Sequence, residues 1–194
     1  MTHATKITLL RLFLVPVFAK FAIDYADSWK VGEPQEPLRW LAVAIFVIIA
    51  ASDGLDGWIA RRFSQQSLLG AILDPLTDKA LLLTGLIVLS LVEWGHNWHL
   101  PLWFIGLVIG REILIIVGIW ILYGLNRHVP IKPHWTGKVC TVTQMFALGW
   151  IMLKIFPFPP LYPTILAAIF TIWSGVAYFH IGIRQLPSVA KSRD

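Results

Sequence analysis

Six apolar segments dominate this chain, and each is about as long as a helix that crosses a lipid bilayer. Such a helix needs about 20 mostly apolar residues. No long linker separates the segments, and they lack the alternation of polar and apolar residues that marks the strands of a membrane barrel. The sequence therefore predicts an all-α integral membrane protein with six transmembrane helices in one domain, residues 1–194. The segments cover residues 6–24, 37–60, 67–93, 100–125, 136–156 and 161–183.

The composition excludes an ordinary soluble domain. Hydrophobic residues make up 57% of the chain and charged residues 14%, whereas about a quarter of the residues of a soluble domain are charged. The formal net charge of +5 does not indicate a nucleic-acid partner. The basic residues lie in short clusters between apolar segments, where membrane proteins carry them. Cys140 is the single cysteine, which excludes an intrachain disulfide and a cysteine metal cage.

The positions of lysine and arginine predict the orientation in the membrane. Cytoplasmic connections of membrane proteins carry an excess of these residues. With six spans and both termini in the cytoplasm, most basic residues fall on the cytoplasmic side. The first outer connection fits least well, because Lys20, Lys30 and Arg39 lie there. The basic residues assigned to the cytoplasmic side are Lys6, Arg11, Arg61, Arg62, Arg127, Lys132, Lys138, Arg184, Lys191 and Arg193.

The most informative stretch runs from Asp53 to Lys79 and contains four aspartates beside apolar segments. An ionisable residue at membrane depth costs about 2.5 kcal/mol or more on insertion scales and usually has a function. Asp53 and Asp56 are three residues apart, which places both on one helix face. Asp74 and Asp78 are four apart and share a face for the same reason. A short polar connection makes the two helices antiparallel neighbours, so we expect the carboxylates to converge near the cytoplasmic interface.

Four close carboxylates would repel one another and take up protons unless a positive charge lay between them. Hard divalent ions that prefer oxygen ligands, Mg2+ or Mn2+, suit such a cluster. The stretch holds no histidine or cysteine, which argues against zinc. Two ions about 4 Å apart would clamp a diphosphate and neutralise charge on a leaving group. The residues predicted to hold the two ions are Asp53, Asp56, Asp74 and Asp78.

Three glycines, Gly54, Gly57 and Gly70, are interleaved with the aspartates. Small residues allow helices to pack closely in membranes. They also leave room for a ligand to approach the backbone. Both interpretations stay open, and the position of the glycines among the acids favours the ligand.

The aspartate stretch resembles the signature of the CDP-alcohol phosphatidyltransferases. It follows the pattern D-x-x-D-G-x-x-A-R, then eight residues, then G-x-x-x-D-x-x-x-D, and every fixed position is filled. The resemblance implies the six-helix membrane fold of that family, usually a homodimer, with its site open to the cytoplasm. The fixed positions are Asp53, Asp56, Gly57, Ala60, Arg61, Gly70, Asp74 and Asp78.

The same resemblance implies a role for each fixed position. The first three aspartates bind two metal ions, and Asp78 completes the site and acts as the general base. Asp78 would take a proton from an acceptor hydroxyl, which attacks the β-phosphorus of CDP-diacylglycerol, and CMP leaves. The residues implied to contact the CDP moiety are Asp53, Gly57, Ala60, Arg61 and Gly70.

The rest of the chain is similar to the bacterial members that make phosphatidylglycerol phosphate in the inner membrane, and to related cardiolipin synthases. The matching stretches are Thr8–Arg11 with Pro16, Asp74–Lys79, Arg111–Glu112, and Gly137–Lys138 followed by Thr141 and Gln144–Met145. Arg111 lies near the middle of a predicted span, where an arginine is costly unless it faces a cavity. Arginine binds phosphate bidentately, so we expect Arg111 and Lys138 to bind the phosphate of glycerol 3-phosphate. The alternative for Arg111 is an ion pair with Glu112 or with an aspartate of the site, and the alternative for Lys138 is a headgroup contact. Ile119 stands where a second arginine is expected, which keeps phosphatidylglycerol, or another alcohol used by a member of this family, open as the acceptor.

A small cation transporter is the alternative from another class of protein, because transporters also carry carboxylates inside the membrane. In this chain the acids gather at one face and do not form a path across the bilayer. Lys154 is the only charge deep in the outer half of the last three segments. The enzyme is therefore favoured, and release of CMP from CDP-diacylglycerol separates the two classes.

Overall fold

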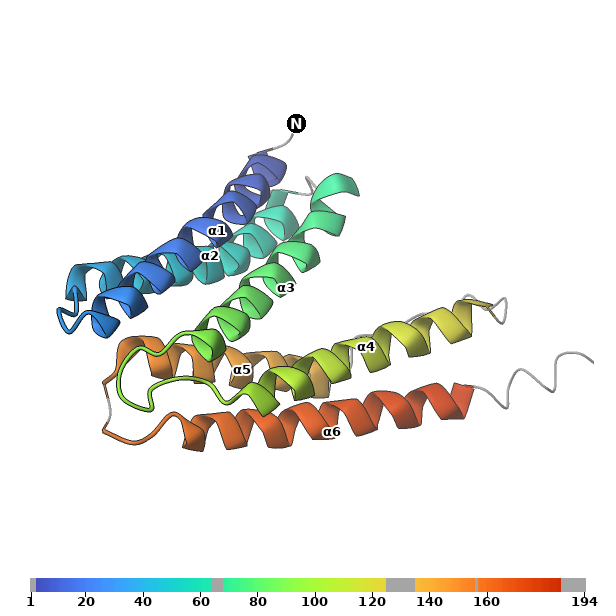
Figure 1. The fold of residues 1–194 in the computed structure, drawn as a ribbon. Helices are drawn as coiled ribbons and strands as arrows, with labels where there is room; N and C mark the ends of the chain where they lie inside the picture. Colours follow the sequence, from blue (N-terminus) through green and yellow to red (C-terminus); the bar gives the residue numbers. More distant parts are fainter. Residues whose placement is uncertain (1–2, 64–67, 125–134, 156, 186–194) are drawn as a thin grey trace, which may run out of the picture. The chain divides into compact units, whose positions relative to one another are not determined.

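The computed structural model describes four stretches of the chain, residues 3–63, 68–124, 135–155 and 157–185. These stretches contain six helices and no strand, which confirms the all-helical prediction (Figure 1). The helices are α1 (His3–Lys30), α2 (Glu36–Phe63), α3 (Leu68–Leu91), α4 (Leu102–Gly124), α5 (Trp135–Leu153) and α6 (Leu161–Gln185). Side chains are described for all of these residues except 3–7, 53–63, 68–75, 123 and 185.

Two of the helices are long and apolar enough to cross a membrane, judged by length and composition. They are α4 over Leu102–Leu122 and α6 over Leu161–Arg184. Only 11% of the most apolar window of α4 and 28% of that of α6 is buried, so most of their apolar surface faces outward. That all six helices cross a membrane stays a prediction.

The chain divides into two compact units. Unit 1 consists of Met1–Leu100 and Leu148–Pro157, and unit 2 consists of Pro101–Ala147 and Phe158–Asp194. The last residues of α5 therefore belong to unit 1, and its earlier residues belong to unit 2. The prediction of a single domain over residues 1–194 is not tested by this division and stays a prediction.

In unit 1, α1 packs along both α2 and α3 (Figure 1). Phe18 of α1 is fully buried, and its ring centre lies 5.6 Å from that of Phe46 in α2. Gly85 of α3 allows Leu148 of α5 to come close, because a Cβ atom at Gly85 would lie 3.0 Å from Cδ1 of Leu148. This packing holds α2 and α3, the two helices that carry the aspartate motif.

The connection between α3 and α4 closes one end of unit 1. The buried Trp94 donates a hydrogen bond from its indole nitrogen to a carbonyl oxygen of α1 at 3.1 Å. Trp98 donates in the same way to the carbonyl oxygen of Ile151 at 3.0 Å. Arg39 of α2 donates to the carbonyl oxygen of Leu153 at 2.9 Å. Because the last carbonyls of a helix have no partner within it, these bonds tie the end of α5 to unit 1.

In unit 2, α4 packs along α6 (Figure 1). Buried polar side chains bond to one another across this unit. Gln144 of α5 donates from Nε2 to the Thr171 hydroxyl oxygen of α6 at 3.0 Å, and the Cys140 thiol donates to the same oxygen at 3.4 Å. Cys140 is thus a buried packing residue.

Candidate active site

The four motif aspartates lie at two matching levels of α2 and α3, consecutive helices that contact each other in unit 1. With a rise of 1.5 Å per residue, Asp53 lies about 15 Å before the end of α2, and Asp78 lies about 15 Å after the start of α3. Asp56 and Asp74 each lie about 10 Å from the same helix ends. The backbone therefore gives the carboxylates the levels that convergence requires.

The side chains of Asp53, Asp56 and Asp74 lie outside the described residues, and so do those of the motif residues predicted to contact CDP. Among the side chains that the structure describes, no group of three or more histidine, cysteine, aspartate or glutamate residues could hold a metal ion. The metal and CDP contacts therefore stay predictions. The donor set fits the ion, since four carboxylates supply only hard oxygen ligands. The CDP contacts in question are Gly57, Ala60, Arg61 and Gly70.

Asp78 is the one motif aspartate whose side chain the structure describes. Its Oδ1 lies 3.5 Å from Nη1 of Arg11 in α1. The Arg11 side chain is 1% exposed and that of Asp78 is 44% exposed, so the ion pair is buried on the arginine side and open on the carboxylate side. A buried arginine needs a counter-charge. Asp78 supplies one and keeps oxygen surface that can reach a ligand.

Arg11 is a partner of Asp78 that the sequence analysis missed. Its position near the N-terminus placed it among the cytoplasmic basic residues, yet the structure buries it in unit 1 together with Thr8. A signal was present, because Arg11 lies inside the apolar segment 6–24, where a charge is expensive unless it is paired. Thr8 and Arg11 are also three residues apart and share a helix face.

Arg111 of α4 lies in a polar cluster of unit 2. Its Nη2 donates a hydrogen bond to the Ser174 hydroxyl oxygen of α6 at 2.8 Å, and its Nη1 forms an ion pair with Glu112. Its guanidinium carbon lies 5.4 Å from the ring centre of Tyr178, one helical turn further along α6. Nε of Arg111 is buried and has no hydrogen-bond partner within the part of the chain that is described. One donor of this arginine is therefore left for another group.

Gly137 of α5 completes this cluster. A Cβ atom at Gly137 would lie 3.0 Å from the hydroxyl oxygen of Tyr178 and 3.3 Å from Nη2 of Arg111. Glycine at this position therefore allows α5 to approach the arginine. The next residue, Lys138, has an exposed side chain.

The structure thus confirms one of the alternatives drawn from the sequence for Arg111, and it shows two further residues beside this arginine. The predicted ion pair of Arg111 with Glu112 is present. Ser174 and Tyr178 were missed by the sequence analysis. Their only signal is that they are two polar residues four apart, on one face of an apolar helix.

The comparisons with known proteins agree with the motif. The profile of the CDP-alcohol phosphatidyltransferase family matches residues 1–178. The CDP-diacylglycerol–glycerol-3-phosphate 3-phosphatidyltransferase of Escherichia coli strain K12 is 31% identical over 180 residues, which cover 90% of this chain and 91% of that protein. Proteins of the same name from Shigella sonnei strain Ss046 and Shigella flexneri serotype 5b are also 31% identical, with the same coverage. The similarity therefore extends far beyond the aspartate motif.

Proposed function

Because this chain belongs to the CDP-alcohol phosphatidyltransferase family, and is thus a transferase, we propose that its acceptor is glycerol 3-phosphate. It transfers the phosphatidyl group of CDP-diacylglycerol to a hydroxyl of that acceptor, releases CMP and forms phosphatidylglycerol phosphate. The observation that carries this choice is the 31% identity, over 90% of the chain, to enzymes named for glycerol 3-phosphate.

The aspartates of α2 and α3 form the metal site of this proposal. When bound, two Mg2+ or Mn2+ ions would neutralise the diphosphate of CDP-diacylglycerol. The matching levels of the aspartates on the two helices and the all-oxygen donor set support this assignment. The residues that would hold the ions are Asp53, Asp56, Asp74 and Asp78, and those along the CDP moiety are Asp53, Gly57, Ala60, Arg61 and Gly70.

Asp78 is the general base in this proposal. Its carboxylate takes the proton of the acceptor hydroxyl while that oxygen attacks the β-phosphorus, and the bond from this phosphorus to CMP breaks. The half-exposed oxygens of Asp78 suit the role, because they can reach a substrate hydroxyl. The buried Arg11 acts as a positioning residue, since its guanidinium holds the carboxylate from the closed side.

Arg111 binds the phosphate of the acceptor, with Lys138 as a second cation. Ser174 and Tyr178 hold the guanidinium from α6. Ile119 favours a second candidate, because one arginine alone gives weaker selection for a small phosphorylated alcohol. That candidate is phosphatidylglycerol, the acceptor of a cardiolipin synthase.

The protein is proposed to be a six-span protein of the bacterial inner membrane, active as a homodimer. Both termini and the aspartate site face the cytoplasm. The apolar surfaces of α4 and α6 support membrane insertion, and the distribution of lysine and arginine supports the orientation.

Release of CMP by the purified protein tests the proposal. The protein in detergent receives CDP-diacylglycerol and Mg2+ or Mn2+, with glycerol 3-phosphate and phosphatidylglycerol offered separately. We expect CMP release that requires the metal and glycerol 3-phosphate. Release with phosphatidylglycerol alone would replace the proposed acceptor by that of the second candidate. No release with either, from protein that binds CDP-diacylglycerol, would overturn both acceptor assignments.

Gly137→Ala is expected to raise the apparent KM for glycerol 3-phosphate by roughly tenfold, with a smaller effect on kcat. The added methyl group would press on the Tyr178 hydroxyl and on Arg111, and overpacking of this kind displaces side chains. Combining it with Tyr178→Phe removes the oxygen that the methyl group would meet at 3.0 Å, so much of the loss should be recovered.

Gly149→Ala on the same helix is the matched control, because nothing lies within 4 Å of a Cβ atom there. It should leave both constants unchanged. An unchanged KM in Gly137→Ala, or no recovery in the double variant, would mean that the contact with Tyr178 does not affect acceptor binding.

A further inference from the structure

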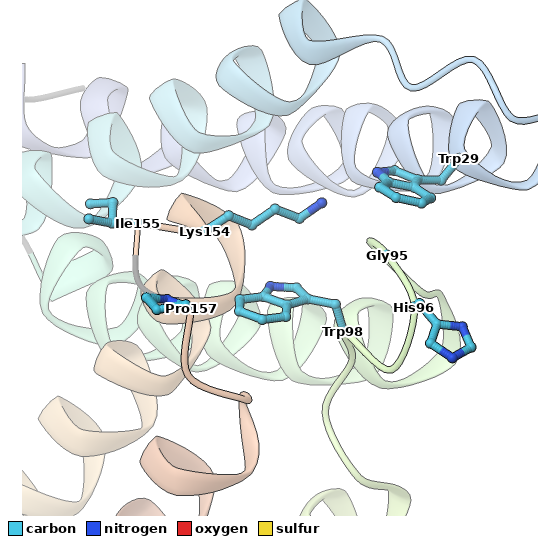
Figure 2. Close-up of a pocket in the computed structure, with 7 residues that line it drawn as sticks. All are labelled: Trp29, Gly95, His96, Trp98, Lys154, Ile155 and Pro157. Atoms are coloured by element: carbon cyan, nitrogen blue, oxygen red, sulfur yellow. The ribbon is translucent and has the colours of Figure 1, made fainter.

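A pocket of about 470 Å³ lies at the end of unit 1 where α1 and α5 finish. It is remote from the aspartates, because Trp29 lies about 27 Å along α1 from Arg11, the partner of Asp78. None of the described residues that line it is acidic. The residues around it are Trp29, Gly95, His96, Trp98, Lys154, Ile155 and Pro157 (Figure 2).

Among the lining residues that the structure describes, Lys154 is the one lysine or arginine. Figure 2 shows its side chain extending toward Trp29 and Gly95. Its Nζ donates hydrogen bonds to the Tyr25 hydroxyl oxygen at 2.8 Å and to the carbonyl oxygen of Trp94, and it lies 5.0 Å from the ring centre of Trp29. No ion pair joins Lys154 to a carboxylate in the described stretches. An ammonium group has three donors, so one donor and the positive charge remain for a ligand.

The backbone conformation of Lys154 also points to a functional position. Its φ is +50°, in the left-handed region, at the residue that follows the end of α5. Helices commonly finish with glycine in this conformation, because any side chain there is strained. Strain of this kind is found most often at functional positions. A lysine at this position gives up the easier backbone of glycine and places an ammonium in the pocket.

The chemistry of the lining selects an anion. A cationic ligand would meet the charge of Lys154, which already lies over the faces of the Tyr25 and Trp29 rings. An anion would meet the ammonium of Lys154, which forms no ion pair in the described stretches, and His96, which also lines the pocket. Trp29 and Trp98 add the aromatic surface that is common where proteins meet lipid headgroups.

We propose that this pocket binds the phosphate of an anionic phospholipid headgroup. The source of the phosphate rests on the membrane placement proposed above. The distance of about 27 Å between the levels of Arg11 and Trp29 is close to the hydrocarbon thickness of a bilayer, about 30 Å. With the aspartates at one interface, the pocket therefore reaches the level of the headgroup phosphates at the other.

Binding of phosphatidylmethanol to the full-length protein in detergent tests the proposal. This lipid is an anionic phosphodiester without a free hydroxyl, so it cannot serve as an acceptor at the active site. Phosphatidylcholine and inorganic phosphate are titrated in parallel, and bound lipid is counted by native mass spectrometry. We expect tighter binding of phosphatidylmethanol than of either. Equal binding of phosphatidylcholine would overturn the preference for an anion, and equal binding of inorganic phosphate would overturn the lipid source.

Two variants locate the site. Lys154→Met keeps an unbranched chain and removes the charge, and Lys154→Gly also relieves the left-handed backbone, which guards against a folding defect. We expect each to weaken phosphatidylmethanol binding by about tenfold, the effect of one charge-assisted hydrogen bond. Lys20→Met is the matched control, because Lys20 is exposed and pairs with Asp24 on α1. Unchanged binding in both Lys154 variants would place the lipid elsewhere, and CMP release by these variants reports separately on the proposed function.

The charge of Lys154 also predicts a pH dependence of lipid binding. Burial first and the nearby charge of Arg39 second lower the pKa of Lys154, Glu36 opposes both, and together they bring it to about 8. The other titratable groups facing it are Tyr25 and His96. Since the phosphodiester stays anionic, the preference for phosphatidylmethanol should fade as the pH rises from about 7 to about 9.5 and Lys154 loses its proton. Lys154→Met should lack this step, and a wild-type preference that persists throughout would contradict the assignment.

Discussion

Asp78→Asn is expected to lower CMP release by about 10²-fold to 10⁴-fold, the range that a positioned general base contributes. Asparagine has nearly the shape of aspartate but cannot accept the proton of the acceptor hydroxyl. CDP-diacylglycerol binding should be largely retained, because the remaining motif residues on α2 and α3 are unchanged. Turnover is measured as CMP release at saturating glycerol 3-phosphate, and CDP-diacylglycerol binding is measured by direct titration of the same preparation.

Asp24→Asn provides a matched control on α1, where an exposed carboxylate pairs with Lys20. It should leave CMP release unchanged. Because Asp78→Asn also removes the counter-charge of the buried Arg11, the unfolding midpoint of each variant is measured as well. Normal turnover in Asp78→Asn would remove Asp78 from the role of base. Loss of CDP-diacylglycerol binding in parallel with turnover would assign it to substrate binding instead.

The helices of this fold could be predicted from the sequence, because each needs only an apolar run of sufficient length. Several of their ends could not, although the start of α6 at Leu161 agrees with the prediction. The predicted end of α1 at residue 24 follows the loss of hydropathy, but the helix continues to Lys30. Tyr25 and Ala26 are fully buried there, and the ring of Tyr25 packs edge-on against Trp94 at 4.9 Å. Tertiary packing therefore extends a helix that local composition would end.

The candidate site, too, could be predicted only in part. The aspartates could be assigned from spacing, since three-residue and four-residue intervals within a helix fix a shared face. The partners of the site residues could not, because they depend on which helices pack together. Arg11 meets Asp78 only through the contact of α1 with α3, and Ser174 meets Arg111 only through that of α4 with α6.

Lys154 shows the limit of reasoning from charge position alone. In the sequence it is a lone cation in an outer half-segment, which argues against a transport path but suggests no contact. The structure gives it a hydroxyl, a carbonyl and two aromatic faces, contributed by α1 and by the connection after α3. None of these partners is near Lys154 in the sequence.

Arg111→Ala is expected to raise the apparent KM for glycerol 3-phosphate by about tenfold to a hundredfold, the effect of losing one or two charge-assisted hydrogen bonds to a phosphate. Changes in kcat should be smaller, since the reacting hydroxyl and Asp78 are untouched. Steady-state CMP release over a range of glycerol 3-phosphate concentrations gives both constants. Arg184→Ala, which removes an exposed arginine near the end of α6, should leave the KM unchanged.

Two further variants separate phosphate binding from a purely structural role of Arg111. Ser174→Ala removes one hydrogen bond to the guanidinium but keeps its charge, so its effect on the KM should be intermediate. Glu112→Gln removes the charge of the ion-pair partner and leaves the charge of Arg111 uncompensated by it, so the KM should fall or stay the same. If the only role of Arg111 were to balance the charge of Glu112, Arg111→Ala and Glu112→Gln would lower stability to a similar extent. Both would leave the KM for glycerol 3-phosphate unchanged. In that case the acceptor phosphate would have to be bound by residues other than Arg111.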